Sequence, residues 1–154
     1  MTITNRMKKT SLIISLGCLL SPSCSSKFMK YESNWAITKF EVEGKDAIPL
    51  IYIFHFEINV NLAKVTPPAV EITPNGNMKV MPCKADFQSK GGKDYIEIFD
   101  HYYFAGIYEI RCVDETCCRI VMENERIYLE MDYNGDLPFG KSRDCPEPRT
   151  PFEK

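Results

Sequence analysis

Apolar and polar residues alternate along one long stretch of the chain. From Leu50 to Val60 every even position is apolar, and from His55 to Asn59 the odd positions are polar. A period of two is typical of a β-strand that buries one face and exposes the other. The pattern therefore predicts a long strand over residues 50–60, with its even-numbered side chains in the core.

Shorter patterns of the same kind follow through the rest of the chain. The first expected strand starts at Trp35 and changes parity near Thr38 or Lys39, which predicts a β-bulge before a turn at residues 44–46. No stretch shows the sustained spacing of an amphipathic helix. The other expected strands are a hairpin around Asn75-Gly76, with Val70, Ile72, Met78 and Val80 in its arms, and residues 85–88, 94–99, 104–112, 118–123 and 126–132.

The many short strands and brief turns favour an all-β fold. Antiparallel strands in sequence order hide their edges most simply by closing into an up-and-down barrel. An antiparallel β-sandwich or roll is the alternative.

The side chains of one hairpin suggest its register. If Cys112 faces Cys118, Ile110 faces Ile120 and the apolar faces of both strands coincide. Pairing Cys112 with Cys117 would put apolar side chains opposite polar ones. We therefore expect Cys112 and Cys118 to be cross-strand neighbours.

The start of the chain carries a targeting pattern. A short basic segment precedes the apolar run of residues 12–20, which is shorter than the roughly 20 residues that a membrane-spanning helix needs. Small residues then lead to Cys24. We expect residues 1–23 to be a signal peptide, with Met1 or Met7 as the natural start.

The run Ser21-Pro22-Ser23-Cys24 resembles the cleavage site of bacterial lipoprotein precursors of the kind common in Bacteroidetes. The resemblance implies that Cys24 is lipidated, with palmitate-type acyl chains, and that the protein is anchored in the cell envelope, at the outer membrane and facing the periplasm. The usual motif has Leu three places before the cysteine, whereas Leu20 stands four places before Cys24. Plain secretory cleavage is the alternative. Cys18 is a rival lipidation site, but too little apolar sequence precedes it to engage a membrane.

Four short motifs of the body share one likeness: Trp35, Gly44-Lys45-Asp46, residues 104–110 (FAGIYEI) and Ile127-Tyr128-Leu129. They resemble motifs of small Bacteroidetes lipoproteins of lipocalin-like type, which implies a lipocalin-like barrel. Lipocalins have Gly two places before the first-strand Trp, where this chain has Ser33. They also have a late Arg that packs on that Trp, for which Arg126 is the candidate.

The barrel interior is the expected binding site. An eight-stranded barrel either holds one small ligand or is filled by its own side chains. We expect a small apolar ligand, and the candidate interior residues are Tyr52, Phe54, Phe56, Phe104 and Tyr108. The expected organisation is a signal peptide at 1–23, a lipidated linker at 24–34, the barrel at 35–139 and a Pro-rich tail at 140–154.

An apolar outer face suggests a second function, as a protein-interaction module of the cell envelope. Tyr95, Phe99, Tyr103 and Ile107 share the outward parity of their strands, which is more apolar than a solvated face should be. The chain's own residues 137–139 could also cover this face. The tail beyond should be mobile unless Cys145 is bridged.

Composition and charge narrow the function further. Apolar residues make up 44% of the chain, enough for a core. Without residues 1–23 the chain keeps 16 of its 19 basic residues and all 21 acidic ones, for a net charge of -5. A weakly acidic chain with scattered lysines does not suit nucleic acid.

The cysteines of the body are expected to form disulfides, because an envelope compartment is oxidising. The register favours Cys112 with Cys118, and Cys145 could pair with Cys117 or Cys83. Cys117 or Cys145 should then be the most reactive to thiol reagents. The cysteine spacing matches no standard zinc pattern, so we expect no metal.

Catalytic motifs are absent from the sequence, so we expect no enzyme and no cofactor. His55 and His101 are interpreted as surface or rim residues. Asp132 to Asp136 resembles the opening of a calcium loop, but Leu137 stands where that loop needs Gly, so a turn is expected.

Overall fold

The computed structural model describes residues 27–71, 80–135 and 143–152. Its elements are η1 (Met29–Tyr31), β1 (Ser33–Val42), β2 (Lys45–Asp46), η2 (Ile48–Leu50), β3 (His55–Asn59), β4 (Lys64–Thr66), β5 (Cys83–Lys90), β6 (Lys93–Ile98), β7 (Gly106–Cys112), β8 (Arg119–Glu123) and β9 (Ile127–Tyr133). Within these residues, no helix is long and apolar enough to cross a membrane.

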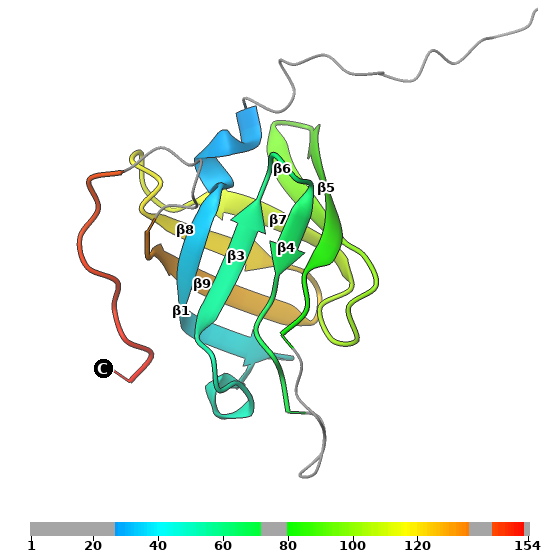
Figure 1. The fold of residues 1–154 in the computed structure, drawn as a ribbon, viewed down its shortest axis with the longest axis vertical. Helices are drawn as coiled ribbons and strands as arrows, with labels where there is room; N and C mark the ends of the chain where they lie inside the picture. The colour runs from blue at the N-terminus through cyan, green and yellow to red at the C-terminus, as the bar shows by residue number, and fades with distance from the viewer. Residues whose placement is uncertain (1–26, 72–79, 136–142, 153–154) are drawn as a thin grey trace, which may run out of the picture.

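The strands close into an antiparallel barrel, as the sequence predicted (Figure 1). Each strand from β3 to β9 pairs with its neighbour in sequence, and β1 pairs with both β3 and β9. The closed ring has eight strands, because β2 pairs only with Glu41 and Val42 at the end of β1 and is not part of the ring. The connectivity is up-and-down, of lipocalin-like type. The bulge in β1 is also confirmed, since the pairing with β9 shifts between Ile37 and Lys39.

Alternate side chains of every long strand point inward and fill the barrel. This packing stabilises the fold, because each large apolar side chain that leaves water contributes about 1.5–3 kcal/mol. The largest fully buried side chains include Trp35, Phe40, Phe56, Phe104, Tyr108, Ile37, Ile58, Ile96, Ile98, Ile110 and Ile120.

One end of the barrel, here called the N-terminal end, is closed by η1. The loops β3–β4, β5–β6 and β7–β8 lie at this end, because consecutive antiparallel strands turn alternately at the two ends. Tyr31, in η1, is buried; its hydroxyl donates to Asp94 at 2.9 Å, and its carbonyl accepts from Trp35 Nε1 at 2.9 Å. These bonds fix η1 across the opening.

The arginine over Trp35 is Arg143, so the expectation of Arg126 was wrong. The Arg143 guanidinium lies 5.4 Å from the centre of the Trp35 ring and donates to the carbonyls of Lys30 and Cys117. Arg126 instead lies 4.9 Å from the Tyr103 ring, at the opposite end of the barrel. Arg143 lies two residues before Cys145, in the part of the tail that the disulfide to Cys118 holds on the barrel.

The tail runs along the outside of the barrel beside β1 and β9 (Figure 1). It is held by a disulfide between Cys145 and Cys118, and by Arg149, whose Nε lies 2.8 Å from Asp132. At its far end Phe152 makes an edge contact with Phe54, with ring centres 5.6 Å apart. The tail therefore spans the barrel from the N-terminal end to the opposite end.

The long strand expected over residues 50–60 was wrong in its first half. β3 begins only at His55, and Leu50 ends the 3₁₀ turn η2. Pro49 explains the difference, because its fixed φ suits a helical turn and its nitrogen cannot donate to a ladder. The hairpin expected around Asn75-Gly76 lies outside the described residues.

The register expected for the β7–β8 hairpin was also wrong, by two residues. Cys112 faces Ile120, and Ile110 faces Met122. A shift of two keeps every side chain on its face, so the apolar pattern alone does not separate the two registers. Cys112 instead bonds Cys117, which the backbone turns inward with a φ of 55°.

Candidate functional site: the mouth of the barrel

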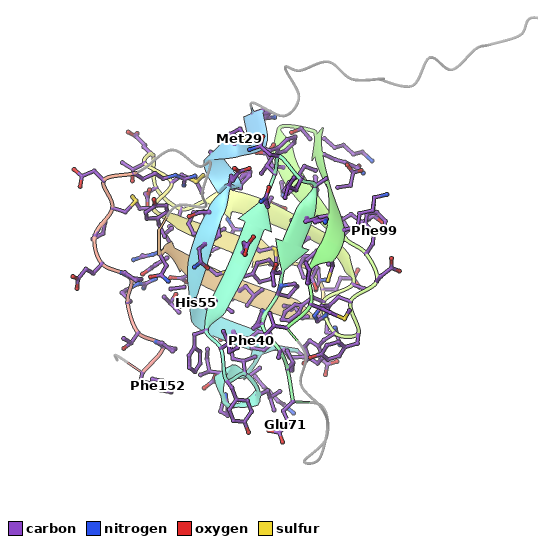
Figure 2. The ribbon with its side chains drawn as sticks, in the orientation of Figure 1. Met29, Phe40, His55, Glu71, Phe99 and Phe152 are labelled. Carbon is purple, nitrogen blue, oxygen red and sulfur yellow. A yellow bond between two sulfur atoms is a disulfide. The ribbon has the colours of Figure 1, made fainter. Side chains whose placement is uncertain are left out.

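The end of the barrel opposite η1, here called the mouth, is formed by the segments 43–54, 66–71, 99–105 and 124–126. Figure 2 shows Met29 at the N-terminal end and Glu71 at the mouth. Three of the five candidate interior residues meet behind the mouth: Phe56, Phe104 and Tyr108 are fully buried. The Phe56 and Phe104 rings are 6.0 Å apart, and the Tyr108 hydroxyl donates to the Phe104 carbonyl at 3.0 Å.

These three side chains act as core rather than as the wall of an open cavity. Phe104 also packs on Phe40, with ring centres 5.8 Å apart. Desolvation by burial raises the pKa of Tyr108 to about 12, so its hydroxyl stays neutral. The interior of this part of the barrel is filled by its own rings.

The other two candidate interior residues lie outside the barrel, so their assignment was wrong. The Tyr52 side chain is 61% exposed, and its hydroxyl donates to Glu71 at 2.9 Å. Phe54 is half-buried beneath Phe152 of the tail. Both precede β3 and follow the turn at Pro49, so the alternation expected there does not apply to them.

His101 is a buried residue of the mouth that sequence reasoning placed at the surface or rim. Its Nδ1 accepts hydrogen bonds from the backbone N–H groups of Tyr103 and Phe104, each at 3.0 Å. Its Nε2 therefore carries the proton, and among the described residues this atom has no hydrogen-bond partner. Desolvation by burial lowers the pKa of His101, so the ring is neutral. Only a solitary histidine next to three aromatic residues marks the site in the sequence.

Tyr102 hydrogen-bonds the segment 66–71 on the neighbouring side of the mouth. Its hydroxyl accepts from the Val70 N–H at 2.9 Å and donates to the Val70 carbonyl at 3.1 Å. Val70 in turn forms an isolated antiparallel bridge with Ile51. The side chains of Ile48, Ile51 and Val70 are all buried, so these segments cover the open end of the barrel at the mouth.

Exposed apolar side chains gather on these same segments. Leu50, Tyr52, Ile53 and Tyr102 are between 38% and 61% exposed. The contacts of Tyr102 with Val70, of Val70 with Ile51, and of Tyr52 with Glu71 place them around one rim. A group of exposed apolar side chains at one end of a barrel is typical of a site that another molecule covers.

The apolar outer face described from the sequence is partly covered by side chains of the barrel itself. Ile107 is 58% exposed, but Tyr95, Phe99 and Tyr103 are half-buried. Lys84 lies over the Phe99 ring at 5.4 Å, and Arg126 over Tyr103. The covering segment 137–139 lies outside the described residues. A shallow pocket beside Ile107 is lined by Asn124, Glu125 and Arg126.

The disulfides differ from those expected. The bonds are Cys112–Cys117 and Cys118–Cys145, so neither the Cys112–Cys118 pair nor the bonding of Cys145 to Cys117 or Cys83 is correct. Cys83 is a free, buried thiol, and desolvation with the nearby charge of Asp100 raises its pKa. The expected labelling of Cys117 or Cys145 fails, since both are bonded.

Metal-binding groups are not assembled in the described part of the chain. Nowhere in residues 27–71, 80–135 and 143–152 do three or more His, Cys, Asp or Glu side chains gather as metal ligands would. Comparisons with protein-family models, with curated proteins and with solved structures find no match to this chain.

Proposed function

We propose that this protein is a lipid-anchored protein of the bacterial cell envelope whose barrel binds a partner protein at its mouth, without catalysis. The observation that carries the proposal is the rim of exposed apolar side chains around a mouth that is already closed by Ile51 and Val70. The filled interior supports this reading over a deep ligand cavity, because a ligand there would displace packed rings. The rim is held in place by the Tyr102 hydrogen bonds, so it is preorganised for binding.

Photo-crosslinking in intact membranes tests the binding site. A photoreactive amino acid at Ile53 should capture one discrete protein, whereas the same probe at Val113 should not. Val113 is the matched control, because it is 51% exposed against 47% for Ile53 and lies at the N-terminal end. Ile53→Asp should reduce capture by a probe at Tyr102 at least tenfold, and Val113→Asp should leave it unchanged. Equal capture from both ends would refute the proposal.

The anchor is tested separately by mass spectrometry of the membrane form. We expect a chain that begins at acylated Cys24, and we expect Cys24→Ser to move the protein into the soluble fraction. A membrane form with an unmodified N-terminus at another residue would refute the lipid anchor but not the binding site.

A second candidate function is binding of a small apolar molecule that carries a hydrogen-bond acceptor. His101 favours it, because its unpartnered Nε2–H is buried at the mouth, where an acceptor group would restore a lost hydrogen bond. Calorimetric titration with decanoate tests this. Binding should weaken at least tenfold in His101→Phe, and Phe152→Ala should be neutral; no binding to the unaltered protein would exclude this class of ligand.

A further inference from the structure

We propose that the N-terminal end of the barrel docks on an anionic membrane surface through a basic patch formed by Lys27, Lys30, Lys90 and Lys93. The proposal rests on the lipid anchor at Cys24 for its geometry, but the patch is a separate property of the folded barrel. It assigns the protein an orientation, with the patch against the lipid headgroups and the mouth turned away.

The chain between the anchor and the barrel is short. Only three peptide steps separate Cys24 from Lys27, and an extended chain covers at most about 3.6 Å per residue, or about 11 Å in all. Lys27 itself is fixed to the barrel, since its Nζ lies 2.7 Å from the Ser89 hydroxyl and 3.1 Å from Asp94. An acylated Cys24 therefore holds this end of the barrel close to the membrane.

The surface that the anchor holds near the membrane is positively charged. Lys90 and Lys93 face each other directly at the tip of the β5–β6 hairpin, and like charges that are directly opposite in a sheet destabilise it. Lys93 also pairs with Glu109 at 2.8 Å, and Lys30 with Asp94 at 2.8 Å. Four lysines thus face two carboxylates, and Asp94 is buried beneath them.

Burial alone would raise the pKa of Asp94, but hydrogen bonds from Lys30, Ser89, Tyr31 and Lys27 hold that pKa well below its usual range. The carboxylate is therefore ionised and its charge is already shared by the lysines around it. The excess positive charge of the patch faces outward.

The other surfaces of the molecule support the same orientation. Leu62, at the tip of the β3–β4 loop, is 63% exposed and lies at this end, where an apolar side chain can enter the headgroup region. Asp114 and Glu115 are on the β7–β8 loop, on the other side of η1 from the β5–β6 hairpin (Figure 1), so the barrel should tilt toward the hairpin. The mouth carries exposed acidic residues, namely Glu43, Asp46, Asp100 and Glu125, which an anionic surface repels.

Vesicle binding tests the patch without the anchor. The Cys24→Ser protein is mixed with vesicles of phosphatidylcholine, with or without phosphatidylglycerol, and sedimented. We expect binding only to the vesicles that contain phosphatidylglycerol, weakening as salt is added. One lysine near an anionic surface strengthens association about fivefold, so Lys90→Glu/Lys93→Glu should weaken binding at least tenfold.

The matched control is Lys39→Glu/Lys45→Glu, which changes the net charge equally. Lys39 pairs with Glu41 at 2.9 Å as Lys93 pairs with Glu109, and Lys45 lies at the mouth in β2. The control should bind as the parent does. Equal loss in the two double variants, or equal binding to both kinds of vesicle, would overturn the docking surface.

Lysine acetylation of the membrane form gives a second readout. On anionic vesicles Lys90 and Lys93 should be protected and Lys45 should react; equal reaction of all three would overturn the orientation while leaving the anchor intact. The anchor and the docking surface can also fail separately. If Cys24 is not acylated but the Cys24→Ser protein still binds vesicles that contain phosphatidylglycerol, the anchor is overturned and the docking surface is supported.

Discussion

Removing the disulfide between Cys118 and Cys145 should destabilise the protein more than removing the one between Cys112 and Cys117. A disulfide stabilises the native state by restricting the unfolded chain, and the effect grows with the length of the loop that it closes. The sequence separations are 27 and 5 residues. The chain-entropy relation then gives losses of about 3.5 kcal/mol for the long loop and about 2 kcal/mol for the short one.

The long-loop disulfide also fixes the tail on the barrel. Without it, Arg149 still pairs with the buried Asp132 and with Glu130, at 2.8 and 2.6 Å, but these contacts hold only the far part of the tail and are not covalent. We therefore expect Cys118→Ser/Cys145→Ser to release the tail for part of the time, and Cys112→Ser/Cys117→Ser to leave it in place.

Two measurements check this prediction. Urea unfolding, monitored by the fluorescence of Trp35, gives the two losses of free energy. Limited trypsin digestion reports cleavage after Arg149, which should accelerate only in the first double variant. Peptide mapping that found Cys112 bonded to Cys118, or equal losses in the two variants, would refute the reasoning.

Three further predictions concern buried side chains. Phe104→Ala should lower the free energy of unfolding by about 3–5 kcal/mol, because four rings lose a packing partner. Phe152→Ala, at an exposed position, should change it by less than about 0.5 kcal/mol. Chemical denaturation checks both. His101 has a lowered pKa in the folded state, so the unfolded chain takes up a proton on His101 at a higher pH than the folded chain does. The free energy of unfolding should therefore fall as the pH drops below about 6.5, by at most about 1.4 kcal/mol per pH unit. His101→Phe should flatten this slope, and an unchanged slope would contradict the assignment. Cys83 is the free thiol of the described chain, and a maleimide should label it only after denaturation; rapid labelling of the native protein would show that its burial is wrong.

Most of the barrel could be predicted from the sequence, because its strands bury one face each. The expected strand at residues 94–99 became β6, and the parity change near Thr38 became the bulge of β1. A buried face leaves a period of two, which is typical of a half-buried strand. The same reasoning gave the right faces for β7 and β8.

The errors came from interactions that the period does not report. Parity is unchanged by a register shift of two, so it did not exclude the observed pairing of Cys112 with Ile120. Cys117 adopts a left-handed conformation that is uncommon outside glycine, and no neighbouring residue signals it. The mouth was misjudged because Ile51 and Val70 are buried by a bridge between segments outside the regular strands.

The pairing of β1 with β9 has a consequence for how the chain reaches its fold. β1 can pair with β3 early during synthesis, but the other edge of β1 stays unpaired until β9, the last strand, has been synthesised. Contacts between distant segments form slowly, because the chain between them must first lose its freedom. Until then β1 offers an open edge of unpaired N–H and C=O groups, to which another chain can add. Aggregation during biogenesis should therefore begin at β1, and mutations that delay β9 should increase it even when the finished barrel is stable.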